Sequence, residues 1–181
     1  MSGEAMDNMI WNDLWGTAHT VKVYALCCSK YANKMRRRKR IIDWAVIIIP
    51  TLGALLYPIN SFCTLGAAIL TAICGVLEKA LPLTTQSEAE LCKLDDLQTT
   101  FEKILTELED AVHSFRLSDT TDIQLKALLK KKKSTIAGLR TEMDKRVRKA
   151  PDSKMLNDEA ELYMKSKFTY FNYSNSSWQR E

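Results

Sequence analysis

The sequence predicts an all-α membrane protein, in which a transmembrane helical hairpin is joined to a cytoplasmic bundle of long helices. Three observations predict this fold class. Within residues 41–82 only Asp43, Glu78 and Lys79 are charged, whereas the rest of the chain is strongly charged. A basic run, KMRRRKR, stands directly before this apolar segment. Elsewhere, apolar residues recur at steps of three and four, the spacing of amphipathic helices.

The first predicted segment, residues 1–40, is an amphipathic cytoplasmic helix that ends in a basic membrane anchor. No Pro or Gly separates Gly16 from Pro50, so one helix is expected to continue into the apolar segment. The apolar stripe of this helix comprises Trp11, Leu14, Ala18, Val21, Ala25, Cys28, Ala32 and Met35.

The basic run has two possible roles. Alone, it is typical either of a nucleic-acid contact or of the cytoplasmic anchor of a membrane helix. The formal net charge of the whole chain is only +4, so the run is a local feature. Because an apolar segment follows at once, we interpret it as an anchor, with both termini in the cytoplasm and no specific nucleic acid as a partner. Its residues are Lys34, Arg36, Arg37, Arg38, Lys39 and Arg40.

Residues 41–81 are predicted to form two membrane spans joined by a tight turn. Ile41–Ile59 and Ser61–Leu81 are each long enough as helices to cover most of a hydrocarbon core of about 30 Å. Pro50 lies within the first span and removes one helical hydrogen bond. We therefore expect a kink or hinge there.

The second span carries small and hydroxyl-bearing residues at steps of three and four, which places them on one helix face. Small residues let transmembrane helices approach closely, and such stripes also line water-filled pores in oligomers. Both roles stay open from the sequence, packing being the more common use. The candidate stripe is Ser61, Thr64, Ala68, Thr71, Gly75 and Glu78.

Residues 82–150 are predicted to form a cytoplasmic antiparallel helical pair of coiled-coil character. The first helix should start at a cap on Thr85 or Ser87 and run to about Phe115, and the second should run from residues 119–120 to about Lys149. The first helix is acidic overall and the second basic, so they should attract each other. Their apolar stripes are Leu94, Leu97, Phe101, Leu105, Leu108, Val112 and Phe115, and Leu125, Leu128, Leu129, Ile136, Leu139, Met143 and Val147.

Two features of the C-terminal half leave more than one interpretation open. The lysine run Lys130–Lys133 is compatible with anionic lipid, nucleotide or RNA, but lysines of this kind are more often solvated or paired. Residues 151–181 should form a short helix, capped by Asp152 or Ser153, and an aromatic tail.

No pattern in the sequence indicates catalysis, a cofactor or a bound metal. His19 and His113 lie far apart, the five cysteines form no C-x-x-C pair, and phosphate-binding glycine motifs are absent. The adjacent Cys27 and Cys28 are candidates for acylation near a membrane, but we expect them to be reduced structural thiols.

The order of these features resembles the SLATT superfamily: a helix opening with WNDLW, the run KMRRRKR, a tight two-span hairpin and a long helical pair. The likeness covers nearly the whole chain and rests on layout more than on individual residues. It implies an oligomeric effector of the bacterial inner membrane, which forms a pore or disrupts the membrane in antiphage defence or programmed cell death. It also implies a trigger, either a cyclic nucleotide or other nucleotide-derived signal or an adjacent sensor protein.

The residues also allow a different function. A membrane protein that assembles through its cytoplasmic coiled helices without conducting ions would be structural or scaffolding. The sequence leaves this alternative open because close helix packing and pore lining use the same small residues.

Overall fold

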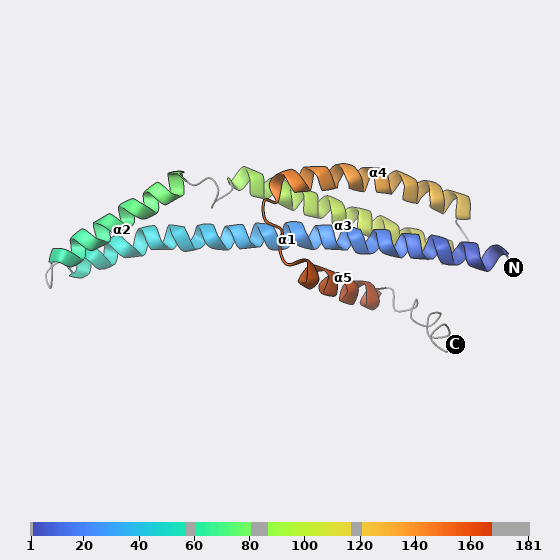
Figure 1. The fold of residues 1–181 in the computed structure, drawn as a ribbon, viewed down its shortest axis with the longest axis horizontal. Coiled ribbons are helices and arrows are strands. Elements are labelled where there is room, and N and C mark those ends of the chain that lie inside the picture. Colours follow the sequence, from blue (N-terminus) through green and yellow to red (C-terminus); the bar gives the residue numbers. More distant parts are fainter. Residues whose placement is uncertain (1, 57–60, 81–86, 117–120, 168–181) are drawn as a thin grey trace. The chain divides into compact units, whose positions relative to one another are not determined.

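The computed structural model describes residues 2–56, 61–80, 87–116 and 121–167, and these residues form helices without any strand (Figure 1). The all-α class is therefore confirmed for the described part of the chain. By contacts, the chain divides into unit 1, Met1–Tyr31 with Leu94–Glu181, and unit 2, Ala32–Lys93. The helices are α1 (Ser2–Leu56), α2 (Ser61–Ala80), α3 (Glu88–Arg116), α4 (Asp122–Arg146) and α5 (Ser153–Lys167).

Helix α1 contributes to both units as one continuous helix. Its predicted apolar stripe is buried from Leu14 to Met35, and only Trp11 at the start is half-buried. Pro50 lies inside the helix, which continues to Leu56. Nearby, the Thr51 hydroxyl donates a hydrogen bond to the Ile47 carbonyl over 2.7 Å. The expectation of a single helix running from the amphipathic segment into the apolar one is thus confirmed.

In unit 2, helix α2 turns back beside the C-terminal part of α1 (Figure 1). Within the described ranges, no helix combines the length and the apolar character that crossing a membrane requires. The transmembrane character of this hairpin therefore stays a prediction.

In unit 1, α3 and α4 run antiparallel, as the sequence predicts (Figure 1). The apolar stripe of α3 is buried from Leu94 to Val112, and Phe115 has no described side chain. On α4 the burial is narrower, because Leu128 and Leu139 are only half-buried, as is Val147 directly after the helix. The buried residues of α4 are Leu125, Leu129, Ile136 and Met143.

Capping groups explain where the helices start and end. Ser87 caps α3, because its Oγ accepts a hydrogen bond from the Glu90 backbone over 3.3 Å. Helix α4 begins after Thr121, whose backbone N–H donates to Oε1 of Gln124 over 3.0 Å. The expected start of α4 at residues 119–120 lies outside the described residues. The expected end at Lys149 is wrong, since Val147 takes an extended backbone conformation and ends the helix.

Helix α5 begins behind Asp152, whose carboxylate accepts a hydrogen bond from the Lys154 backbone over 2.9 Å, in line with the predicted cap. One face of α5 is buried in unit 1 through Leu156, Ala160 and Met164. The predicted aromatic tail after Lys167 lies outside the described residues.

Candidate functional site

The first candidate site is a large exposed apolar surface on unit 2. Among the described side chains of the chain, fourteen large hydrophobic residues are exposed, and all but three of them belong to α1 beyond residue 40 or to α2. Contiguous exposed apolar surface marks membrane or partner contacts. We call this set the apolar hairpin surface: Ile41, Trp44, Ile47, Ile48 and Leu52 on α1, with Phe62, Leu65, Ile69, Leu70, Ile73 and Val76 on α2.

The spacing on α2 explains why five of these side chains form one surface. Phe62, Leu65, Ile69, Ile73 and Val76 follow steps of three, four, four and three, so they lie along one face of the helix. Phe62 is 78% exposed and Val76 63%, values normally found for polar side chains. In the isolated chain, these side chains are therefore largely exposed.

The predicted small stripe lies on α2, but only part of it is described at the level of side chains. Ala68 is exposed, and Thr71 and Gly75 are half-buried, with the Thr71 hydroxyl donating to the Ala67 carbonyl over 2.8 Å. A Cβ built on Gly75 would meet no described atom within 4 Å. Within the described residues, the small size of Gly75 thus serves no close contact. The side chains of Ser61, Thr64 and Glu78 lie outside those described.

The basic run lies along α1, directly before the apolar hairpin surface. Two of its members approach Glu88 at the start of α3: Arg36 Nε lies 3.9 Å from one carboxylate oxygen and Lys39 Nζ 3.5 Å from the other. Pairs this exposed contribute at most about 1 kcal/mol. The remaining members are exposed to solvent: Lys34, Arg37, Arg38 and Arg40.

The four lysines at the centre of α4 have different surroundings. Lys132 forms an ion pair with Glu107 of α3, and this hydrogen bond lowers the pKa of Glu107. Lys133 forms an ion pair with Asp13 of α1. Lys130 and Lys131 are exposed. Two of the four lysines in the run Lys130–Lys133 are therefore in ion pairs, and the other two are exposed to solvent.

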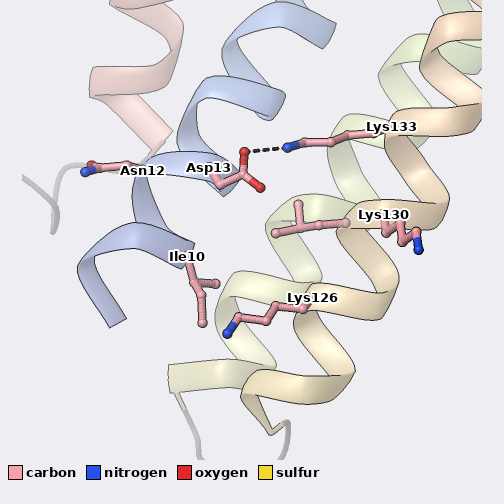
Figure 2. Close-up of a pocket in the computed structure, with 7 residues that line it drawn as sticks. Ile10, Asn12, Asp13, Lys126, Lys130 and Lys133 are labelled. Carbon is pink, nitrogen blue, oxygen red and sulfur yellow. Dashed lines mark hydrogen bonds and ion pairs between the residues drawn. The ribbon is translucent and has the colours of Figure 1, made fainter. Parts of the chain in front are cut away.

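A second candidate site is a cleft of about 790 Å³ between the N-terminal part of α1 and α4 (Figure 2). The sequence analysis missed it, because Asp13 and Lys133 meet across 120 sequence positions. Two local signals were present. One was the lysine run Lys130–Lys133, noted above as compatible with lipid, nucleotide or RNA, and the other was the spacing of Lys126, Leu129 and Lys133, which places them on one face of α4. The lining residues are Ile10, Asn12, Asp13, Lys126, Leu129, Lys130 and Lys133.

The adjacent cysteines Cys27 and Cys28 are buried in α1 as free thiols, 5% and 0% exposed. Burial raises the pKa of Cys28 to about 12, and the neighbouring Cys27 adds to the shift. A thiol that rarely ionises is a poor nucleophile, so the two side chains act as core residues. Among the described residues, no group of three or more metal-ligating side chains gathers.

Helix α5 is held on the bundle by polar contacts as well as by its buried face. The Tyr163 hydroxyl donates to Oε1 of Glu109 on α3 over 3.0 Å, and Lys22 Nζ of α1 lies 3.8 Å from the Tyr163 ring centroid. Lys30 of α1 forms an ion pair with Glu159. These contacts join α5 to both α1 and α3.

Comparisons of the chain with family models, with curated proteins and with solved structures find no match. The resemblance to the SLATT superfamily therefore stays a prediction from the layout of the sequence.

Proposed function

We propose that the chain is an oligomeric membrane effector whose apolar hairpin enters a lipid bilayer. When a trigger acts, the assembled hairpins form a pore or disrupt the bilayer. The observation that carries the proposal is the apolar hairpin surface. From the resemblance above, we extend the proposal to antiphage defence or programmed cell death at the bacterial inner membrane, with both termini in the cytoplasm.

Exposing apolar side chains to water is unfavourable in free energy, so the apolar hairpin surface is expected to bind lipid or protein. Burying a large apolar side chain contributes about 1.5–3 kcal/mol, and six such residues on α2 alone are exposed. A bilayer would cover all of them at once. The proposal rests on this exposure and not on the length of the described helices. The predicted spans run on to Ile59 and Leu81, which lie outside the described residues.

The positive charge next to the apolar hairpin surface supports an orientation in which both termini lie in the cytoplasm. Lys34, Arg37, Arg38 and Arg40 are exposed immediately before Ile41, the first exposed residue of the surface. Basic residues close to an anionic leaflet contribute about 1 kcal/mol each. Headgroup contact by these side chains would hold the end of the hairpin at the cytoplasmic face.

Assembly into an oligomer is supported by the described part of the small stripe. Ala68 is exposed, and the space at Gly75 is open in the single chain, so this part of α2 is free to receive a helix of another copy. The same openness favours the second candidate function, a scaffolding membrane protein whose copies pack through this stripe without a conducting path.

Insertion is tested by flotation of the full chain with vesicles of phosphatidylcholine and phosphatidylglycerol. The wild type should float with the vesicles. Ile69→Arg, which places a charge on the apolar hairpin surface, should reduce the bound fraction about tenfold or more, because an arginine in a bilayer costs about 2.5–3.5 kcal/mol. The matched control is Ile123→Arg on α4, where the side chain is 80% exposed and outside the surface. A wild-type chain that stays with the soluble fraction would overturn the proposal.

Release of a trapped dye from the same vesicles separates the two functions. For an effector, we expect release by the wild type and less release by Thr71→Leu, with flotation unchanged. A chain that floats and forms oligomers but releases no dye, and that leaves the membrane potential of expressing bacteria normal under every trigger, is a scaffold.

A further inference from the structure

We infer that the cleft between α1 and α4 is a binding site for a phosphate-bearing small molecule. The cleft lies wholly within unit 1, and the inference does not depend on membrane insertion. We define the lysine cleft by its seven lining residues: Ile10, Asn12, Asp13, Lys126, Leu129, Lys130 and Lys133.

Lysine side chains flank the cleft on the α4 side. Figure 2 shows Lys126 and Lys133 extending from α4 towards α1, one near Ile10 and the other meeting Asp13. Their spacing of seven positions is two helical turns, so the two ammonium groups share one face of α4. Lys130 lies on the turn between them and its side chain points away from α1 (Figure 2).

The lining has an excess of positive charge. It contains three lysines and one carboxylate, but Lys130 points away from α1 and the carboxylate of Asp13 pairs with Lys133, so the excess charge that faces the cleft comes from Lys126. Lys126 and Lys130 form no ion pair within the described part of the chain. Both members of the Asp13–Lys133 pair are about half exposed, at 49% and 48%. An incoming anion would therefore need little desolvation to compete with Asp13 for Lys133.

The apolar part of the lining favours a ligand that is more than a bare ion. Ile10 and Leu129 are only 4% and 3% exposed and form an apolar floor between the charged residues. A volume of about 790 Å³ falls in the range of small-molecule pockets, roughly 300–1,000 Å³. Lysines bind phosphate as point charges, and the volume of the cleft leaves room for an organic group beside the phosphate.

The surrounding charges argue against an extended polyanion such as RNA. Glu107 pairs with Lys132 and Asp13 with Lys133, so carboxylates stand on both sides of the lysine run. A nucleic-acid backbone needs a continuous basic track, whereas these two carboxylates interrupt the positive charge of the lysine run. The described geometry thus favours a compact anionic group.

The test is binding of ATP, inorganic pyrophosphate and adenosine to the full chain in neutral detergent micelles, measured by calorimetry. ATP and pyrophosphate should bind and adenosine should bind at least about tenfold more weakly. Lys126→Gln and Lys133→Gln should each weaken ATP binding about tenfold. The control is Lys131→Gln, the same change on an exposed residue outside the lining, which should change affinity by about twofold at most.

Asp13→Asn tests whether Asp13 competes with the ligand for Lys133. It removes the carboxylate that competes for Lys133 and should tighten ATP binding by about threefold to tenfold. Circular dichroism checks that each variant keeps the helical content of the wild type. Absence of binding to all three probes, binding of adenosine as tight as that of ATP, or a loss in Lys131→Gln as large as in Lys126→Gln would overturn the inference.

A competition arm identifies the source of the phosphate group. If vesicles of phosphatidylcholine with phosphatidylglycerol displace ATP, and pure phosphatidylcholine vesicles do not, the natural ligand is a lipid headgroup. If neither vesicle displaces ATP, the ligand is a soluble phosphate compound. Both outcomes retain the lysine cleft as the binding site, provided that Lys126→Gln weakens ATP binding as stated above.

Discussion

Removing the hydroxyl group of Tyr163 is expected to loosen α5 from the bundle by about 1 kcal/mol. The substitution Tyr163→Phe keeps the ring, and with it the contact to Lys22, whose Nζ lies 3.8 Å from the ring centroid. It removes only the hydrogen bond to Glu109, in which the two oxygen atoms lie 3.0 Å apart. The experiment therefore measures one polar contact that joins α5 to α3.

The magnitude follows from the pKa of Tyr163. Burial, and then the hydrogen bond and charge of Glu109, raise this pKa from 10.0 to about 12. Two pH units correspond to about 2.7 kcal/mol, of which burial is the largest cause. Because the tyrosine is half-buried, we discount the remainder for solvent screening and expect about 1 kcal/mol from Glu109, or about 2–4 °C in Tm.

The pH dependence has a definite sign. Below the unfolded pKa of about 10, the phenol is protonated in both states and the contribution of the hydrogen bond is fully present. As the pH rises towards about 12, the folded chain holds a proton that the unfolded chain has lost, so stability falls. The stability difference between the wild type and Tyr163→Phe should therefore be constant up to about pH 10 and shrink above it.

The assay is urea unfolding followed by far-UV circular dichroism, for the two single variants Tyr163→Phe and Glu109→Gln and for their combination. The coupling between the two changes should be about 0.5–1 kcal/mol. Tyr24→Phe is the matched control, because its ring packs on Phe101 with centroids 5.6 Å apart and its hydroxyl has no hydrogen bond among the described residues. Additive effects of the two changes, or a stability difference that does not shrink above pH 10, would refute the reasoning.

Two further predictions concern the buried thiols and one ion pair. Iodoacetamide at neutral pH should label Cys92 and leave Cys27 and Cys28 unlabelled until denaturant is added, as measured by peptide mass spectrometry. Labelling of Cys28 in the folded chain would contradict its burial and its raised pKa. Lys132→Gln should lower stability at neutral pH by about 0.5 kcal/mol, a value discounted because Glu107 is 38% exposed. Since Lys132 lowers the pKa of Glu107, this difference should persist above about pH 4.3 and vanish as the pH falls below it; an unchanged difference in acid unfolding would contradict the pairing.

Local patterns in the sequence predicted most of the helices, because their causes are local. The apolar stripe from Leu14 to Met35 is buried as its spacing indicates. The caps at Ser87 and Asp152 were also predictable, because a short polar side chain can satisfy the backbone N–H groups of the helix that follows it.

The parts that sequence reasoning missed depend on contacts between distant segments. No local pattern shows that Lys133 meets Asp13, or that Tyr163 meets Glu109, because each pairing depends on how helices pack. The end of α4 was missed for a related reason: the apolar spacing continues to Val147, although the backbone there is already extended. Periodicity indicates a face and does not by itself end a helix.

The two kinds of burial along α1 follow from two different apolar patterns in its sequence. From Leu14 to Met35 the apolar residues occupy one face, which is buried, and the opposite face is polar. From Ile41 to Leu52 apolar residues occur on every side of the helix, and packing against one neighbour leaves Trp44, Ile47 and others exposed. No arrangement of one helix against another covers such a segment on all sides. The basic run lies where the first pattern changes into the second. In a helix that passes from water into lipid, basic residues are expected at this position.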